Sequence, residues 1–397
     1  GNTYTLPEFN YLDFIGRKKE IADLNVMVDS ISGQILPKAP IIIYGEEGIG
    51  KTALAIHFAR QYTDRKNSKA YYLSFERSMY ETILETFAPL HSSTRESYLR
   101  WSANKPADSK LFSDVIHVLS SATNFQDILI IDNIDYRPKQ PSSLCLGNPD
   151  DISPKSFWEL CHSFPKGKSG NTQLPAGFDL FTELSNIPAQ LILITNSTPE
   201  KGNQHYTHLG AMPPADIEAT AVSIWNKFKD DHRNLTEQQL ISAINRFSVL
   251  VNNNTLAVTL FAHTACYYSG NPNLNNWLSS IYTFYKDRYS ICKFLFEHSA
   301  LNTSAKQFLY IASKSFRVSL TAVENASNGY IGNSEKYLRH LVSSGFMYYD
   351  RPQKVIYFHP YIQYFLDNYA SKVNEVFNGN NQVSWNEASQ DKDLFLF

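Results

Sequence analysis

The first half of the chain alternates between short, continuously apolar runs and longer amphipathic stretches. Such runs, rich in β-branched residues and bounded by turn residues, are typical of strands buried on both faces of a sheet. The stretches between them carry apolar residues at helical spacing, as in Gly16–Ile31. The pattern predicts a parallel sheet with helices on both faces and strands at Pro40–Tyr44, Ala70–Phe75, Asp127–Ile131 and Gln190–Thr195.

From about residue 210 the pattern becomes purely helical. Pro214 opens one apolar-periodic stretch, Thr236 and Gln239 form a capping-box pattern before the next, and a third begins near Thr255. We therefore expect an α/β domain over 1–209 and an all-α domain over 210–290.

The last third of the chain combines helices with a β-hairpin. Helices followed by a hairpin are the order of a winged-helix domain, which we expect over 291–372. The expected helices are Ala305–Ala312, Leu320–Glu324 and Glu335–Ser343, and the expected strands are Phe346–Tyr349 and Val355–Phe358.

Two stretches are polar and rich in turn-forming residues. Residues 137–184 separate two of the expected core strands, which indicates an insertion in the first domain. Residues 373–397 indicate a polar tail or linker.

Composition narrows the classes of protein that fit. Apolar residues make up 43% of the 397 positions, and the formal net charge of −2 argues against a dominant attraction to nucleic acid or anionic lipid. The four cysteines stand far apart without metal-ligand spacing, which favours a reducing, cytoplasmic compartment. The apolar runs are far shorter than the roughly 20 residues that cross a bilayer, so no membrane segment is expected.

One motif carries specific chemistry. The sequence GEEGIGKT matches G-x-x-x-x-G-K-[ST] at every fixed position, between an expected strand and an expected helix. In such a loop the glycines allow the backbone amides to approach phosphates, the lysine offers a cation to the β- and γ-phosphates, and the hydroxyl of Thr52 holds Mg²⁺. The residues expected to contact the nucleotide here are Gly45, Gly48, Ile49, Gly50, Lys51, Thr52 and Ala53.

An acidic residue at the end of another expected strand would complete the metal site begun by Thr52. DILIIDNID over Asp127–Asp135 is an apolar strand ending in Asp132, whose carboxylate is expected to hold Mg²⁺ directly or through water. Asn133 stands where many ATPases carry a second acid, and an amide cannot accept the proton of an attacking water. Slow hydrolysis is therefore expected, with Asp135 as a possible substitute base.

The fourth strand also ends in polar residues, and Thr195 or Asn196 is expected to touch the γ-phosphate or the attacking water. No guanine-reading N-K-x-D follows a strand, which favours ATP and ADP over guanine nucleotides.

The order of these motifs resembles the STAND class of P-loop ATPases, in its NB-ARC/NACHT-like group, over nearly the whole chain. FIGRKKEI at Phe14–Ile21 is similar to the family motif that precedes the phosphate loop and wraps the adenine. The resemblance implies that Phe14 and Ile15 cover the base and that Arg17 fixes the segment.

Two later segments extend the resemblance. NNTLA at Asn253–Ala257 resembles the family's Gly-Leu-Pro-Leu-Ala segment, which places Leu256 at the nucleotide, although Thr255 replaces the proline. FHPYIQYF at Phe358–Phe365 resembles the Met-His-Asp motif, with Pro360 at the aspartate position. The resemblance implies that His359 reaches the β-phosphate of ADP.

The family implies a switch that ADP holds closed and that ATP opens into a homo-oligomer. Effector and sensor parts would then lie outside this chain, and the setting would be immune or anti-phage signalling. Alternatives are a DNA-binding AAA+ ATPase of the origin-recognition kind, a STAND-type transcription regulator and a steady-turnover ATPase. The few basic residues of Glu335–Ser343 make nucleic acid an unlikely partner.

Overall fold

A computed structural model describes residues 6–8, 14–74, 79–105, 108–134, 180–199, 205–227, 235–267, 273–284, 287–314, 317–326 and 335–374. Asp135 and nearly all of the predicted insertion and tail lie outside these residues.

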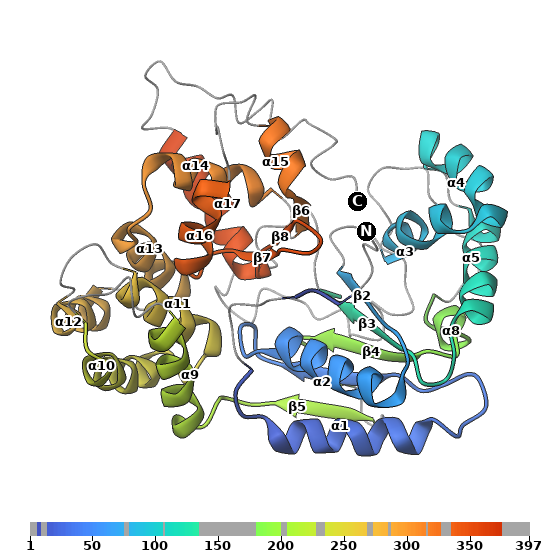
Figure 1. Cartoon of the computed structure of the whole chain (residues 1–397), viewed down its shortest axis with the longest axis horizontal. Coiled ribbons are helices and arrows are strands. Elements are labelled where there is room, and N and C mark those ends of the chain that lie inside the picture. The colour runs from blue at the N-terminus through green and yellow to red at the C-terminus, as the bar shows by residue number, and fades with distance from the viewer. Residues whose placement is uncertain are drawn as a thin grey trace.

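A five-stranded parallel sheet organises the first part of the chain (Figure 1). Its order is β2-β3-β4-β1-β5, so the central β1 lies between β4 and β5. Because the strands are parallel, their carboxyl ends meet at one edge of the sheet, where α/β proteins bind ligands. The strands are β1 (Ile41–Gly45), β2 (Ala70–Ser74), β3 (Ile128–Asp132), β4 (Gln190–Thr195) and β5 (Tyr206–Leu209).

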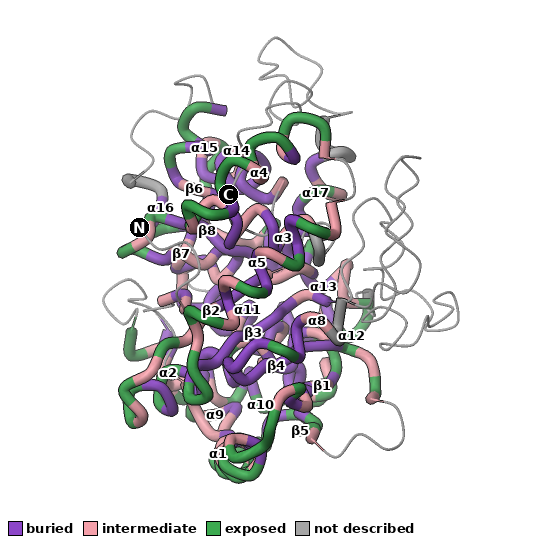
Figure 2. The backbone as a smooth tube through the Cα atoms, turned by 90° about the vertical axis from the view of Figure 1, so that its right-hand side faces the viewer, coloured by how far each residue is buried: buried purple, intermediate pink, exposed green. Residues whose placement is uncertain are grey.

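Helices cover both faces of this sheet, and the two faces alternate along each strand. Ile41 and Ile43 pack with α1 (Lys18–Ile31) and α2 (Lys51–Lys66), whereas Ile42 packs on the opposite face. This alternation explains why β1, β3 and β4 are buried at nearly every position (Figure 2). The second face carries α3 (Met79–Phe87), a 3-10 turn (Ala88–Leu90), α4 (Ser92–Asn104), α5 (Ser109–Ala122) and α8 (Leu180–Ser185).

A helical part follows the sheet. The capping box of Thr236 and Gln239 forms as predicted, with each side chain accepting a hydrogen bond from the other's backbone amide. The helices are α9 (Pro214–Lys227), α10 (Glu237–Leu250), α11 (Thr255–Cys266), α12 (Leu274–Phe284) and α13 (Arg288–His298).

Over its described residues, the C-terminal part contains three helices, a small antiparallel sheet of order β6-β8-β7 and a last helix. Its elements are α14 (Thr303–Ala312), β6 (Arg317–Ser319), α15 (Leu320–Ala326), α16 (Glu335–Ser343), β7 (Tyr348–Asp350), β8 (Val355–Tyr357) and α17 (Pro360–Asn374). One buried cluster extends from Met212 to Ala370, and α13 runs across position 290, where we placed a domain boundary. The helical and C-terminal parts therefore share a core.

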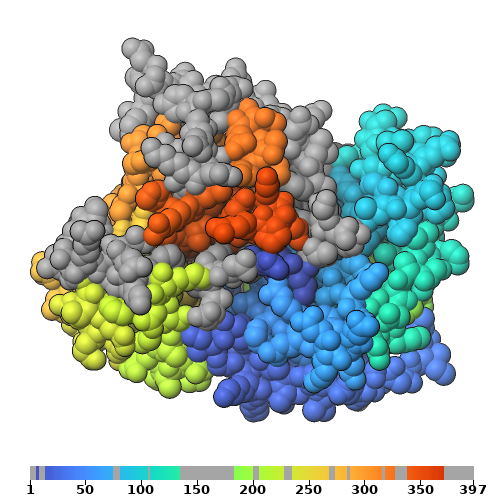
Figure 3. All heavy atoms as spheres, viewed as in Figure 1, coloured from blue at the N-terminus to red at the C-terminus, as the bar shows by residue number. Residues whose placement is uncertain are grey.

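The C-terminal hairpin packs directly against the α/β part, as the orange and blue surfaces in Figure 3 show. Val355 and Tyr357 belong to the buried cluster of α1, α2 and the sheet. The backbone amide of Glu8 also donates to Oδ2 of Asp350 at 3.2 Å. We call this arrangement, in which the hairpin packs on the cluster of α1, α2 and the sheet, the closed arrangement.

The four strands predicted in the first half are present, each within one residue of its expected ends. The sequence analysis missed β5, β6 and the helices between β2 and β3. In β5 only alternate residues are buried, so it lacks the apolar run that marked the other strands. The last helix, α17, continues to Asn374 and so includes the first two positions of the predicted tail.

Phe296 lies at the centre of the shared core, fully buried against the rings of Tyr310, Phe346, Phe365 and Tyr369. We expect Phe296→Ala to lower the free energy of unfolding by about 3–5 kcal/mol, because a large cavity remains. Denaturant titration measures this loss. Tyr282→Ala, at a side chain that is 72% exposed, should change stability by less than about 0.5 kcal/mol. Equal effects of the two substitutions would contradict the packing described.

Candidate nucleotide-binding site

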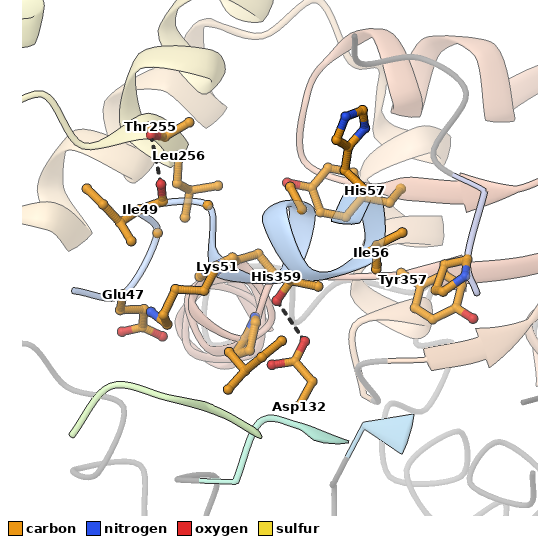
Figure 4. Close-up of a pocket in the computed structure, with 18 of the residues that line it drawn as sticks. Glu47, Ile49, Lys51, Ile56, His57, Asp132, Thr255, Leu256, Tyr357 and His359 are labelled. Carbon is orange, nitrogen blue, oxygen red and sulfur yellow. Dashed lines mark hydrogen bonds between the residues drawn. The ribbon is translucent and has the colours of Figure 1, made fainter. Parts of the chain in front are cut away.

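A pocket of about 440 Å³ opens at the carboxyl edge of the large sheet (Figure 4). Its walls come from the β1–α2 loop, the ends of β3 and β4, residues 14–17, the start of α11 and the junction of β8 with α17. Segments more than 300 residues apart in sequence therefore surround one cavity.

The lysine at the end of the β1–α2 loop forms hydrogen bonds with carbonyls of the same loop. The ammonium of Lys51 donates to the carbonyls of Gly45 and Glu46 at 2.9 and 2.8 Å. Gly48 and Gly50 have φ angles of 81° and 104°, in the left-handed region that glycine enters without a steric penalty. The loop leads directly into α2, whose amino end faces the pocket.

The next three carbonyls of the loop accept hydrogen bonds from the start of α11 and from the residue before it. The side-chain amide of Asn254 donates to Glu47, the backbone amide of Leu256 to Gly48 and the hydroxyl of Thr255 to Ile49, at 2.9, 2.8 and 3.1 Å. A trans peptide holds its C=O and the following N–H on opposite sides. With the carbonyls of Glu47 and Ile49 turned to α11, the amides of Gly48 and Gly50 point the opposite way, where backbone N–H groups can bind anions, whereas the amide of Ile49 donates to the carbonyl of Glu46 at 3.3 Å.

A buried carboxylate lies beside this loop. Asp132 is 3% exposed and accepts hydrogen bonds at Oδ2 from Thr52 Oγ1 and Tyr72 OH, both at 2.7 Å. The backbone amide of Asn133 donates to its Oδ1 at 2.7 Å. Burial raises the pKa of Asp132, while the hydrogen bonds from Thr52 and Tyr72 oppose the rise.

The oxygens of Thr52 and Asp132 suit a magnesium ion. Mg²⁺ prefers hard oxygen ligands and is usually held through one or two protein groups together with substrate phosphates. The two side chains come from α2 and β3 and meet next to the phosphate loop, so they would hold the ion between protein and phosphates. Bound there, Mg²⁺ would neutralise phosphate charge.

Asn133 has a different partner. Its side-chain amide donates to Ser74 Oγ at 2.6 Å, and its backbone has a φ of 57°. The residue at the position of the usual second acid is thus tied to β2.

An apolar region lies at the other end of the pocket. Phe14 stacks on His57 with ring centroids 4.2 Å apart and an interplanar angle of 14°. Ile15 and Ile56 also line this region. Arg17 is buried and donates to the carbonyls of Ile49 and Gly210 at 3.3 and 2.8 Å, so it holds the segment against the phosphate loop.

His359 reaches the pocket from the start of α17. Its Nδ1 accepts a hydrogen bond from the amide of Tyr361 at 3.1 Å, so the ring caps the helix. Burial and the positive charges of Lys51 and Arg288 lower the pKa of His359 to about 3. The ring is therefore neutral, with its proton on Nε2. Pro360 occupies the first helical position, where proline is favoured, which accounts for the residue found there in place of an aspartate.

The structure brings nearly all of the predicted site residues to this pocket. Only Gly45, whose carbonyl binds Lys51, does not line it, and Asp135 lies outside the described residues. Their roles toward a nucleotide stay predictions. The lining residues that sequence reasoning missed include Pro7, His57, Arg60, Tyr72, Ser74, Met212, Thr220 and Tyr348. Tyr72 and Ser74 could have been found as the two hydroxyl-bearing residues that share one face of the strand predicted beside Asp127–Ile131.

The fold and this loop are those of a P-loop nucleotide-binding domain followed by a helical part. No family model and no curated protein match the sequence. Among the described residues, no helix is long and apolar enough to span a membrane.

Solved structures similar to this chain include a STAND ATPase with a tetratricopeptide-repeat sensor from Pyrococcus horikoshii, at 17% identity and a TM-score of 0.49. That match covers 97% of this chain and 48% of the other, so the chain spans about half the length of that protein. The ORC1 protein of Aeropyrum pernix, solved in complex with DNA, is similar at 12% identity, 91% and 95% coverage and a TM-score of 0.41. A Walker-type ATPase of Pyrococcus abyssi is similar at 10% identity, 91% and 98% coverage and a TM-score of 0.40.

Acid should lower the free energy of unfolding through His359. The unfolded chain protonates His359 near pH 6.5, whereas the folded chain keeps it neutral down to about pH 3, so stability is lost as pH falls between these values. We expect a loss of about 2 kcal/mol from this histidine between pH 7 and pH 5. His359→Asn keeps an acceptor for the helix cap but does not titrate, so its denaturant titrations should show a pH dependence smaller by that amount. An unchanged pH dependence would contradict the burial of a neutral ring.

Proposed function

We propose that this chain is a switch controlled by adenine nucleotides, which ADP holds closed and ATP releases for self-assembly. The observation that carries the proposal is the presence of His359 in the same pocket as the phosphate loop. A nucleotide in this pocket would touch the first and the last described parts of the chain together, so its phosphates could affect how those parts are arranged.

The phosphates would lie against the amides of Gly48 and Gly50 and the amino end of α2. Lys51 would turn its ammonium from the carbonyls of Gly45 and Glu46 toward them. Phe14 and Ile15 would cover the base. Asp132 and Thr52 would hold the magnesium ion that accompanies the nucleotide.

The latch would consist of His359 and the amino end of α17. Because Nδ1 accepts from the backbone, the ring has an Nε2–H with which it can donate to an anion. The first turn of α17 adds the partial positive charge of a helix amino end at the same place. Both would attract the terminal phosphate of ADP and draw the C-terminal part onto the nucleotide.

The helical part would respond to changes in the phosphate loop through its hydrogen bonds to the carbonyls of the loop. Asn254, Thr255 and Leu256 bind three successive carbonyls, and Arg288 forms an ion pair with Glu46. Moving α11 and α13 away would leave these groups without their partners, so loop geometry and domain arrangement are coupled.

Typical interaction free energies show how far the nucleotide alone could shift the equilibrium between the closed and open forms. A hydrogen bond to a charged group contributes about 1.5–3 kcal/mol. Moving a population from almost wholly closed to almost wholly open needs about 5.5 kcal/mol of differential binding. The hairpin contacts of Val355 and Tyr357 further favour the closed form. A trigger or oligomer contacts must therefore supply the remainder.

The wider role follows from the resemblance described above. Assembly would bring together effector parts outside this chain, in immune or anti-phage signalling. Hydrolysis would be slow, because Asn133 cannot accept a proton and its amide is bound to Ser74.

A DNA-binding ATPase is the second candidate, since one similar structure was solved with DNA. Arg339 and His340 are exposed on α16 and are the basic residues available there among the described side chains. Binding of duplex DNA with a steep salt dependence would favour this candidate.

Replacing Lys51 tests nucleotide binding. We expect Lys51→Ala to reduce ADP and ATP affinity by at least about 10-fold, since a charge-assisted contact is lost. Calorimetric titration measures the affinity. Lys19→Ala, at an exposed position of α1, should bind as the unaltered chain does. Unreduced binding by the Lys51 variant would refute the assignment of the loop.

Replacing His359 tests the latch. We expect His359→Asn, which keeps the cap but lacks the Nε2–H, to release ADP about 10-fold faster and to assemble more readily. ADP release and particle mass are measured with ADP and with ATP bound. His340→Asn, at an exposed residue of α16, serves as the control. ADP release at the rate of the control would contradict the latch. A monomer in every nucleotide state would contradict self-assembly.

A further inference from the structure

The edge strand β2 contributes two hydroxyl groups to the end of β3. The register pairs Tyr72 with Ile130 and Ser74 with Asp132. Side chains alternate along a strand, so all four lie on the face of the sheet that α2 covers. Ser74 binds the side chain of Asn133, while Tyr72 binds the carboxylate of Asp132.

Tyr72 reaches this carboxylate along the diagonal of the strand pair. It stands opposite Ile130, two positions before Asp132, a separation that an aromatic side chain can span. Its ring is 4% exposed and packs in the apolar cluster with Ile128 and Ile130. Phenylalanine would fill this space equally well, so packing explains the ring and leaves the hydroxyl to be explained.

The hydroxyl fixes the carboxylate in one orientation. Oδ2 of Asp132 accepts from Thr52 and Tyr72, and Oδ1 accepts from the amide of Asn133. Thr52 belongs to the phosphate loop and would itself contact the metal. Tyr72 belongs to the sheet, so its hydrogen bond would persist whatever the loop binds.

We propose that Tyr72 is a positioning residue, whose hydroxyl holds Asp132 in the orientation that captures Mg²⁺ with the nucleotide. This inference rests on the proposed nucleotide binding and extends it to a residue outside the recognised motifs. Groups that orient metal-binding carboxylates typically contribute 10–100-fold to metal affinity. If the hydroxyl of Tyr72 bound Asp132 only to gain a hydrogen-bond partner in the core, its removal would leave the magnesium affinity unchanged.

The test compares ADP affinity with and without magnesium, using the full chain, ADP as the probe, and either EDTA or MgCl₂. The ratio of the two dissociation constants gives the gain from magnesium. We expect Tyr72→Phe to reduce this gain about 10-fold and to change the affinity in EDTA by less than about 2-fold. Tyr62→Phe, in the same buried cluster but outside the pocket, should keep the full gain.

A double-mutant cycle shows whether Tyr72 acts through the carboxylate. In an Asp132→Asn background, Tyr72→Phe should change the magnesium gain by less than about 2-fold, because the group it orients is already lost. An undiminished gain in Tyr72→Phe, an equal loss in EDTA, or the same effect in both backgrounds would each overturn the inference. ADP binding by the unaltered chain in EDTA would still support the proposed function. No ADP binding under either condition would overturn both.

Discussion

The site depends on where the carbonyls of the phosphate loop point. A loop that offers its amides to an anion must place its carbonyls elsewhere, and carbonyls buried without donors cost free energy. Here each of the carbonyls at positions 47–49 accepts a hydrogen bond from Asn254, Thr255 or Leu256, about 200 residues further along the chain. The geometry of the phosphate loop is thus fixed partly by the helical part.

The C-terminal part also contributes to the surroundings of this pocket. The hairpin of β7 and β8 adds Val355 and Tyr357 to the core of the first domain, and α17 begins at the pocket wall. Charge is concentrated where these parts meet. Lys51 and Arg288 both lie close enough to His359 to lower its pKa, so a neutral imidazole is kept among cations. An anion placed there would relieve the repulsion between those cations.

Much of the first domain could be predicted because its strands are buried on both faces and its phosphate loop has fixed spacing. Ile41–Gly45 and Ile128–Asp132 carry that signal in their own residues. By contrast, β5 is an edge strand in which only Thr207 and Leu209 are buried, so no continuous run marks it. The site was predicted where motifs supply it, as at Lys51 and Asp132. It was missed at Tyr72 and His57, whose relevance arises from register and helix packing.

The shared core that extends from Met212 to Ala370 has a mechanical consequence. Because α13 runs continuously across position 290 and both parts share this core, α9–α17 would turn as one lever rather than as two hinged pieces. The pivot would then be the short connector between β5 and α9, at Gly210–Pro213, where Arg17 binds the carbonyl of Gly210. A small rotation at this pivot would be amplified at the distant end of the lever, which is where α14 and α15 lie (Figure 1).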